Sequence, residues 1–310
     1  MTELQRYLAE EVAEDHVDGI ITRREAVRRL GLLGVSGAAA SALLSSFAAG
    51  GAAAATPPRS GRGGRSSEWA PVATEAITFA GPTATLMGAW APAERPRGGV
   101  LVIHENRGLT PHIRTVAGRF AADGYAALAI DLLSEEGGTD ALADDAARMA
   151  ALAAADPARF DADLKAAVTE LKRRLPRRRI AAIGFCFGGG MVWRLLAAGE
   201  PRLAAAAPFY GPFPTGGDLS GSRAAVLGVY GGLDNRVNAT REPARAALAA
   251  ARLPHEILTL TEADHAFFND TGTRFNAPAA AEAWRRVLDW FDRYVERGHD
   301  RHGRGHDHDG

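Results

Sequence analysis

Short apolar runs alternate with amphipathic stretches along most of this chain. The apolar runs lie at residues 75–79, 85–90, 99–103, 125–130, 180–183, 203–209, 224–230 and 255–260. Stretches with helical period lie at residues 112–122, 140–154, 158–175, 191–198, 242–251 and 278–295. Short apolar runs between helical stretches favour strands buried on both faces. The alternation therefore predicts an α/β fold, with a mostly parallel central sheet, helices on both of its faces and an opening hairpin at Gly81-Pro82.

A glycine-rich turn follows the apolar run at residues 180–183. It reads G-F-C-F-G at residues 184–188, and two more glycines follow. A G-x-C-x-G turn between a strand and a helix is typical of a nucleophile elbow, in which glycines let the neighbouring backbone crowd a strained residue. Cys186, the only cysteine of the chain, is therefore a candidate nucleophile. The alternative is a small buried core residue.

Two further residues complete a candidate triad in the order that α/β hydrolases use. Asp234 follows the run at 224–230, and His265 follows the run at 255–260. The carboxyl ends of parallel strands share one edge of a sheet, so these side chains are expected to meet Cys186 there. A thiol is mostly protonated at neutral pH, and His265 would activate it while Asp234 fixes the imidazole tautomer. Taken singly, Asp234 could be a turn residue and His265 a hydrogen-bonded loop histidine.

From about residue 75 to residue 295 the chain resembles the dienelactone hydrolases, which are α/β hydrolases with a cysteine, aspartate and histidine triad. The resemblance rests on the triad motifs and on V-I-H-E-N-R-G-L at residues 102–109. It implies that Glu105 contacts the resting thiol and releases it to His265 when substrate binds. It also implies an oxyanion hole made by the backbone N–H groups of Asn106 and Phe187.

The chain departs from this family where the substrate carboxylate would bind. The family's two arginines are absent: L-S-E-E follows Asp131-Leu132, and Asn269 stands four residues after the histidine. Arg107 or Arg274 could replace them. Tyr210 and Phe213 are candidates for the acyl pocket, although aromatic residues there are as often packing. The expected substrate is therefore a small ester or lactone, without a commitment to dienelactone itself.

The N-terminal region predicts export. T-R-R-E-A-V-R-R at residues 22–29 resembles a twin-arginine motif, and an uncharged run at 30–47 and a small-residue cleavage site at 53–55 follow. A transmembrane anchor is the alternative. The acidic, helix-prone segment at 3–18 is longer than the leading region that usually precedes the motif of a signal peptide. We expect residues 1–55 to be the signal region and 56–72 a linker. Export would place the protein in the periplasm or outside the cell, with the twin-arginine machinery as a partner.

Residues 73–296 are expected to form the single catalytic domain. At more than about 200 residues, this domain is large enough to bury a core without disulfides. The His-rich end, residues 297–310, is expected to be a disordered tail, with weak metal binding as the alternative. A formal net charge of −1 gives no reason to expect nucleic acid as a partner. We expect a monomer, no cofactor and no catalytic metal.

The sequence thus predicts a carboxylic ester hydrolase similar to carboxymethylenebutenolidase, which acts through a Cys186 thioester. Two alternatives remain. A thioesterase or peptidase could use the same triad, and a catalytically silent binding protein could share the fold.

Overall fold

The computed structural model describes residues 1–50 and 70–296, and one eight-stranded sheet forms its centre. The strands are β1 (Glu75–Ala80), β2 (Thr85–Ala91), β3 (Gly98–Ile103), β4 (Tyr125–Asp131), β5 (Ile180–Phe185), β6 (Leu203–Phe209), β7 (Ala225–Gly231) and β8 (His255–Leu260). Their spatial order is β1-β2-β4-β3-β5-β6-β7-β8. β1 and β2 form the antiparallel hairpin, and β3 to β8 run parallel. The predicted α/β-hydrolase fold is confirmed.

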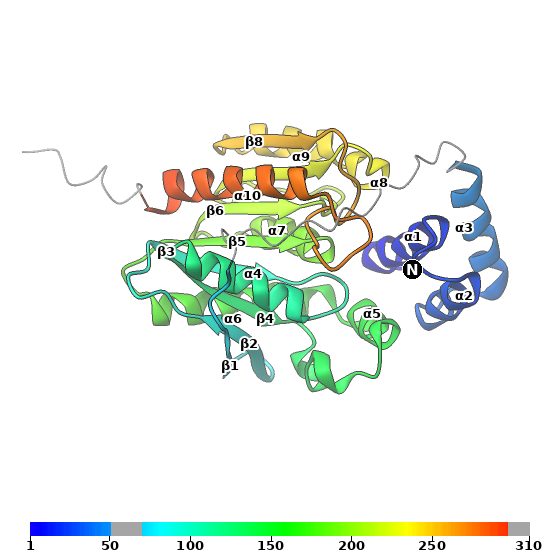
Figure 1. The fold of residues 1–310 in the computed structure, drawn as a ribbon, viewed down its shortest axis with the longest axis horizontal. Coiled ribbons are helices and arrows are strands. Elements are labelled where there is room, and N and C mark those ends of the chain that lie inside the picture. The colour runs from blue at the N-terminus through cyan, green and yellow to red at the C-terminus, as the bar shows by residue number, and fades with distance from the viewer. Residues whose placement is uncertain (51–69, 297–310) are drawn as a thin grey trace, which may run out of the picture.

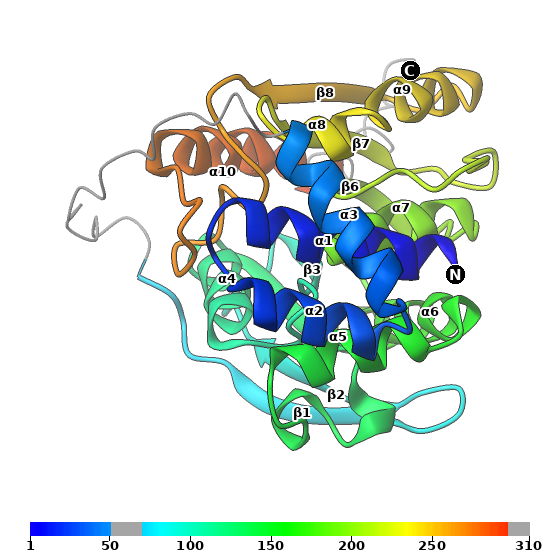
Figure 2. The same cartoon turned by 90° about the vertical axis from the view of Figure 1, so that its right-hand side faces the viewer.

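Helices cover both faces of this sheet (Figures 1 and 2). α4 (Pro111–Ala122) and α10 (Ala277–Phe291) lie on one face, and α6 (Pro157–Arg174), α7 (Phe187–Ala197) and α9 (Arg241–Ala250) lie on the other. The remaining helices of the domain are α5 (Asp145–Ala154) and the single turn α8 (Asn235–Asn238). Every residue of β3 to β7 is buried, because parallel strands are covered on both faces.

Three helix boundaries differ from those that the sequence predicts. α7 begins at Phe187 rather than at residue 191, because the low helix propensity of three successive glycines hides its first turn. Two 3₁₀ turns, Ser134–Glu136 and Thr139–Ala141, precede α5, and the second takes up the start of its predicted range. α10 ends at Phe291, where a π-helical turn, Asp292–Glu296, replaces the predicted last turns.

The N-terminal region forms three helices that lie across the carboxyl edge of the sheet (Figure 2). They are α1 (Glu3–Val17), α2 (Arg23–Leu32) and α3 (Gly37–Gly50). The uncharged run at 30–47 is not one helix, since residues 33–36 separate α2 from α3. Within residues 1–50 and 70–296, no helix combines the length and apolar character needed to cross a bilayer. The expected cleavage site, most of the linker and the His-rich tail lie outside the described residues.

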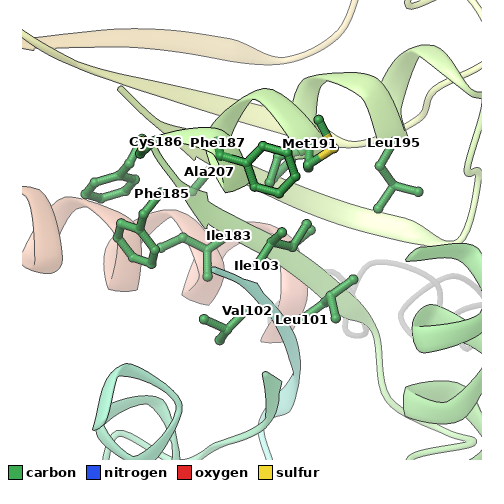
Figure 3. Packing of buried hydrophobic residues seen from close by; sticks show 14 of the residues in the cluster. Leu101, Val102, Ile103, Ile183, Phe185, Cys186, Phe187, Met191, Leu195 and Ala207 are labelled. Atoms are coloured by element: carbon green, nitrogen blue, oxygen red, sulfur yellow. The ribbon is translucent and has the colours of Figure 1, made fainter. Parts of the chain in front are cut away.

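The core supports the turn that follows β5. Figure 3 shows Cys186 at the junction of β5 and α7, which is supported by a layer of packed side chains that includes Ile103 of β3, Ile183 of β5 and Met191 of α7. All of these side chains are buried. A turn fixed on such a packed base holds its residue rigidly at the edge of the sheet.

Candidate active site

Cys186 occupies a strained turn directly after β5. Its φ of 55° lies in the left-handed region, which is costly for a residue with a side chain. Its N–H donates to the carbonyl of Phe209 at 3.1 Å. Two of the three other positive-φ non-glycine residues in the described part of the chain, Tyr210 and Ala266, also lie beside the triad residues. Strain of this kind concentrates at functional sites, which supports a working role for the turn.

Glycines around Cys186 allow two backbone segments to touch. A Cβ at Gly184 would lie 2.1 Å from the carbonyl oxygen of Gly188. A Cβ at Gly188 would lie 2.3 Å from the carbonyl oxygen of Ile103 and 2.5 Å from that of His104. The elbow can therefore approach the loop after β3 only without side chains at these positions, and this approach brings the loop at residues 104–107 beside Cys186.

We expect Gly188→Ala to destabilise the protein by about 1–3 kcal/mol, because the new methyl group meets fixed backbone. In a domain of this size that loss lowers Tm by roughly 2–4 °C per kcal/mol. Gly190→Ala, in the same helix, is the matched control, since its Cβ would meet nothing closer than 3.4 Å. Thermal unfolding of both variants checks this, and equal Tm values for the two would contradict the close approach.

His265 and Asp234 form a buried pair beside the elbow. Nδ1 of His265 lies 2.7 Å from Oδ2 of Asp234. Oδ1 of Asp234 accepts from the N–H of Val237, which fixes the carboxylate at the start of α8. Burial opposes the charged imidazole, yet the carboxylates of Glu11 and Asp234 raise the pKa of His265 well above its usual range. The pairing leaves Nε2 as the nitrogen that can exchange a proton with a neighbouring group.

The thiol lies close to this imidazole. The ligand atoms of Glu11, Cys186 and His265 are all within 4.8 Å of one another. Burial raises the pKa of the Cys186 thiol, the negative charges of Glu11 and Glu105 add to this effect, and His265 opposes it. This combination favours the protonated thiol form of Cys186. A sulfur, an imidazole and a carboxylate could also hold a metal ion such as zinc.

The loop after β3 places Glu105 and Asn106 at the site. Oε2 of Glu105 accepts from the amide of Asn269 at 2.7 Å, and both residues are buried. In the described part of the chain no hydrogen bond joins Glu105 to the thiol, and the oxygen that contacts Sγ belongs to Tyr7. Phe187 is the first residue of α7, where backbone N–H groups have no acceptor within the helix. The two N–H groups predicted for the oxyanion hole thus lie on segments that touch through Gly188.

The other predicted site residues take different positions. Tyr210 is fully buried, and its ring lies 5.2 Å from that of His265, edge to face. Phe213 lines a pocket of ≈ 400 Å³ together with Phe187. Arg107 extends instead toward α5, where its Nε lies 3.5 Å from Asp145. The structure therefore brings Tyr210 to His265, places Phe213 in a pocket beside Phe187, and shows Arg107 engaged with a carboxylate.

Three site residues were not expected from the sequence. Tyr7 and Glu11 of α1 reach the triad: the hydroxyl of Tyr7 lies 3.3 Å from Sγ of Cys186, and Oε1 of Glu11 lies 3.0 Å from Nε2 of His265. Arg236 of α8 lies 2.9 Å from Oε2 of Glu11. Glu11, Glu14 and Asp15 lie on one face of α1, which is a visible signal, but the sequence does not show what that face contacts.

We expect the Glu11–His265–Asp234 network to stabilise the protein most between about pH 4.5 and pH 6.5. The pKa of His265 is raised, so its contribution is complete below about pH 6.5 and is lost as the pH rises. The pKa values of Glu11 and Asp234 are lowered despite burial, chiefly by His265, so their contribution is lost in acid. Raising the pH from 6.5 to 8.5 should lower Tm by several degrees, because each pH unit costs up to about 1.4 kcal/mol when only the folded state keeps the proton.

Calorimetry of the wild type and of Glu11→Gln over this pH range checks the expectation. The variant should lose much of the decline, because one of the two carboxylates that raise the pKa of His265 is gone. An unchanged slope in the variant would mean that Glu11 does not control this imidazole.

Comparison with known proteins agrees with this geometry. The model of the dienelactone hydrolase family matches residues 86–295. A protein of Escherichia coli named as a carboxymethylenebutenolidase is 34% identical over 211 residues, which cover 63% of this chain and 76% of that protein. A protein of the same name from Synechocystis sp. is 30% identical over 212 residues, which cover 62% of this chain and 84% of that protein.

Solved structures show the same similarity. One, named as a dienelactone hydrolase from Klebsiella pneumoniae, is 28% identical with a TM-score of 0.58 and covers 71% of this chain and 98% of its own. A dienelactone hydrolase-like promiscuous phosphotriesterase from metagenomic libraries is 27% identical with a TM-score of 0.63, and the match covers 73% of this chain and 99% of that protein. Both proteins lie almost entirely within the matched part, so a domain of this extent folds without a counterpart to the rest of the chain.

Proposed function

Because the chain belongs to the dienelactone hydrolase family, we propose that it cleaves a small ester or lactone through a thioester on Cys186. Family membership makes it a carboxylic ester hydrolase. The observation that carries the thioester proposal is the arrangement of the buried His265–Asp234 pair beside a cysteine on a strained elbow.

In the proposed reaction, Nε2 of His265 takes the proton of Cys186 and the sulfur attacks the substrate carbonyl. The N–H groups of Asn106 and Phe187 stabilise the oxyanion. The tetrahedral intermediate expels the alkoxide, which receives the proton from His265, and a thioester remains. Water, deprotonated by His265, then cleaves the thioester and restores the thiol. Asp234 stabilises the imidazolium in both halves of the reaction.

Glu105 has a positioning role in this proposal. Its link to Asn269 holds one oxygen, and its other oxygen has no hydrogen-bond partner in the described residues. A negative charge near Sγ keeps the thiol protonated until substrate binds, since like charges oppose ionisation. Asn269, which stands where the family has an arginine, thus holds Glu105 by a neutral amide.

Arg236 is our candidate to replace the family's missing arginines. Its side chain is 11% exposed and lies beside the same carboxylate that contacts His265. A carboxylate on the substrate could occupy this place and gain a charge-assisted contact. Tyr210 and Phe213 would bound the acyl side, and Arg107 would lie at the entrance. An acidic lactone and a neutral ester are therefore both candidate substrates.

Export by the twin-arginine route remains part of the proposal. Arg23 and Arg24 are exposed at the start of α2, which supports their recognition by an export machinery. The location after export would be periplasmic or extracellular.

The test is hydrolysis of dienelactone and of a short aryl ester, by the full chain and by a chain that begins at residue 70. We expect the shorter chain to hydrolyse at least one of them. If Arg236 binds a substrate carboxylate, Arg236→Gln should raise KM for dienelactone about tenfold or more and change KM for the neutral ester little. Cleavage of amides or acyl thioesters alone would favour the peptidase or thioesterase, and inertness toward every substrate would favour the binding protein.

A further inference from the structure

Helix α1 fills the approach to the nucleophile. Tyr7, Leu8, Glu11 and Val12 of this helix are buried, and Cys186 is only 3% exposed beneath it. The hydroxyl of Tyr7 lies 3.3 Å from Sγ. Figure 2 shows α1 across the carboxyl edge of the sheet, where the triad lies. With α1 in this position, the pocket of ≈ 400 Å³ that remains is walled on one side by the helix itself.

Glu11 contacts the imidazole nitrogen of His265 that the proposed reaction needs. Nδ1 of His265 is hydrogen-bonded to Asp234, so in the proposed reaction Nε2 must accept the proton of the thiol. Oε1 of Glu11 lies 3.0 Å from that Nε2. The resulting ion pair keeps the imidazole protonated, and a protonated imidazole cannot act as a base. The docked helix therefore blocks the chemistry as well as the space.

Complementary charges hold the helix in place. Arg236 lies 2.9 Å from Glu11 and 3.0 Å from Glu14, and its guanidinium stacks 4.7 Å from the ring centre of Tyr7. Arg274, in the loop after β8, lies 3.0 Å from Asp15 and also pairs with Asp18. Two arginines of the catalytic domain thus bind one acidic face of α1. Both guanidinium groups are largely buried, so removing their acidic partners would leave uncompensated charges and disfavour the docked helix.

We propose that α1 is an inhibitory segment of this chain, which docks in the substrate site with Tyr7 at the nucleophile and Glu11 at the catalytic histidine. The full chain is then latent, and it becomes active when α1 leaves. The proposal rests on the proposed function, because it assigns to α1 the place of that enzyme's substrate. Removal of the N-terminal region by processing would free Arg236 and Arg274 together with the triad.

The test compares three forms of the protein with the wild-type full chain. The first is the double variant Glu11→Lys/Asp15→Lys, which sets like charges against Arg236 and Arg274. The second, Glu75→Lys/Glu94→Lys, makes the same change of charge at exposed positions of the catalytic domain away from α1 and is the matched control. The third is the chain that begins at residue 70. Each is assayed for hydrolysis of a short aryl ester and for the rate at which iodoacetamide labels Cys186, the only cysteine.

We expect the first variant and the shortened chain to hydrolyse the ester at least about tenfold faster than the full chain, which corresponds to a site blocked about 90% of the time or more. Labelling of Cys186 should accelerate similarly, and the control should match the wild type. Equal rates in all four proteins would overturn the proposal. So would slower hydrolysis by the first variant and the shortened chain, since α1 would then complete the active site.

The labelling rate separates this proposal from the proposed function. If no form hydrolyses any ester but release of α1 still accelerates labelling about tenfold, the occlusion stands and the proposed activity is wrong. If every form hydrolyses the ester and is labelled at one rate, the activity stands and the occlusion is wrong.

Discussion

Alanine in place of Cys186 is expected to reduce ester hydrolysis by at least about 10³-fold, because the methyl side chain cannot attack the carbonyl to form the acyl intermediate. The measurement is kcat/KM of the chain that begins at residue 70, with and without the substitution. The side chain lost is small and buried, so the fold should persist. Retention of more than a tenth of the activity would mean that the sulfur is not the nucleophile.

Cys186→Ser gives the companion measurement. A serine hydroxyl fits the same turn but is a poorer nucleophile here, since its proton is harder for His265 to remove. We expect the kcat/KM of the serine variant to lie between the values of the wild type and the alanine variant. Near-ultraviolet circular dichroism, which is sensitive to the packed aromatic residues around the elbow, verifies that both variants keep the native packing.

Asparagine in place of Asp234 should lower kcat by about 10²–10⁴-fold with a smaller change in KM. The amide can no longer accept from Nδ1–H with a full charge, so the imidazole loses both its tautomer preference and the stabilisation of its charged form. The pH profile should change as well, because Asp234 helps to raise the pKa of His265.

Asp264→Asn is the matched control for that variant. Asp264 precedes His265 and accepts from its backbone N–H at 2.7 Å, but it does not touch the ring. We expect its kcat to stay within a factor of a few of the wild type. A similar loss in both variants would point to loop distortion rather than to the charge of Asp234.

The central domain could be predicted because its signals are local. Eight apolar runs match eight strands within one or two residues, and the G-x-C-x-G pattern marked a turn whose glycines are required by backbone contacts. Asp234 and His265 could be placed because parallel strands end at one edge of the sheet. Their roles in catalysis remain predictions, although the structure brings the two side chains together.

The contacts of the N-terminal region could not be predicted. The sequence shows acids at positions 11, 14, 15 and 18, on one helical face, but not the two arginines that they meet more than 200 residues later. The uncharged run at 30–47 resembled one continuous segment, whereas the chain turns at residues 33–36. Such pairings depend on tertiary packing, which no local pattern encodes.

The negative charges around Cys186 also affect how readily oxidants react with its sulfur. Peroxides attack the thiolate rather than the thiol, and a lone cysteine has no partner with which to form a protective disulfide. Burial and the charges of Glu11 and Glu105 keep this sulfur protonated at rest. The same arrangement therefore protects Cys186 from irreversible conversion to a sulfinic acid.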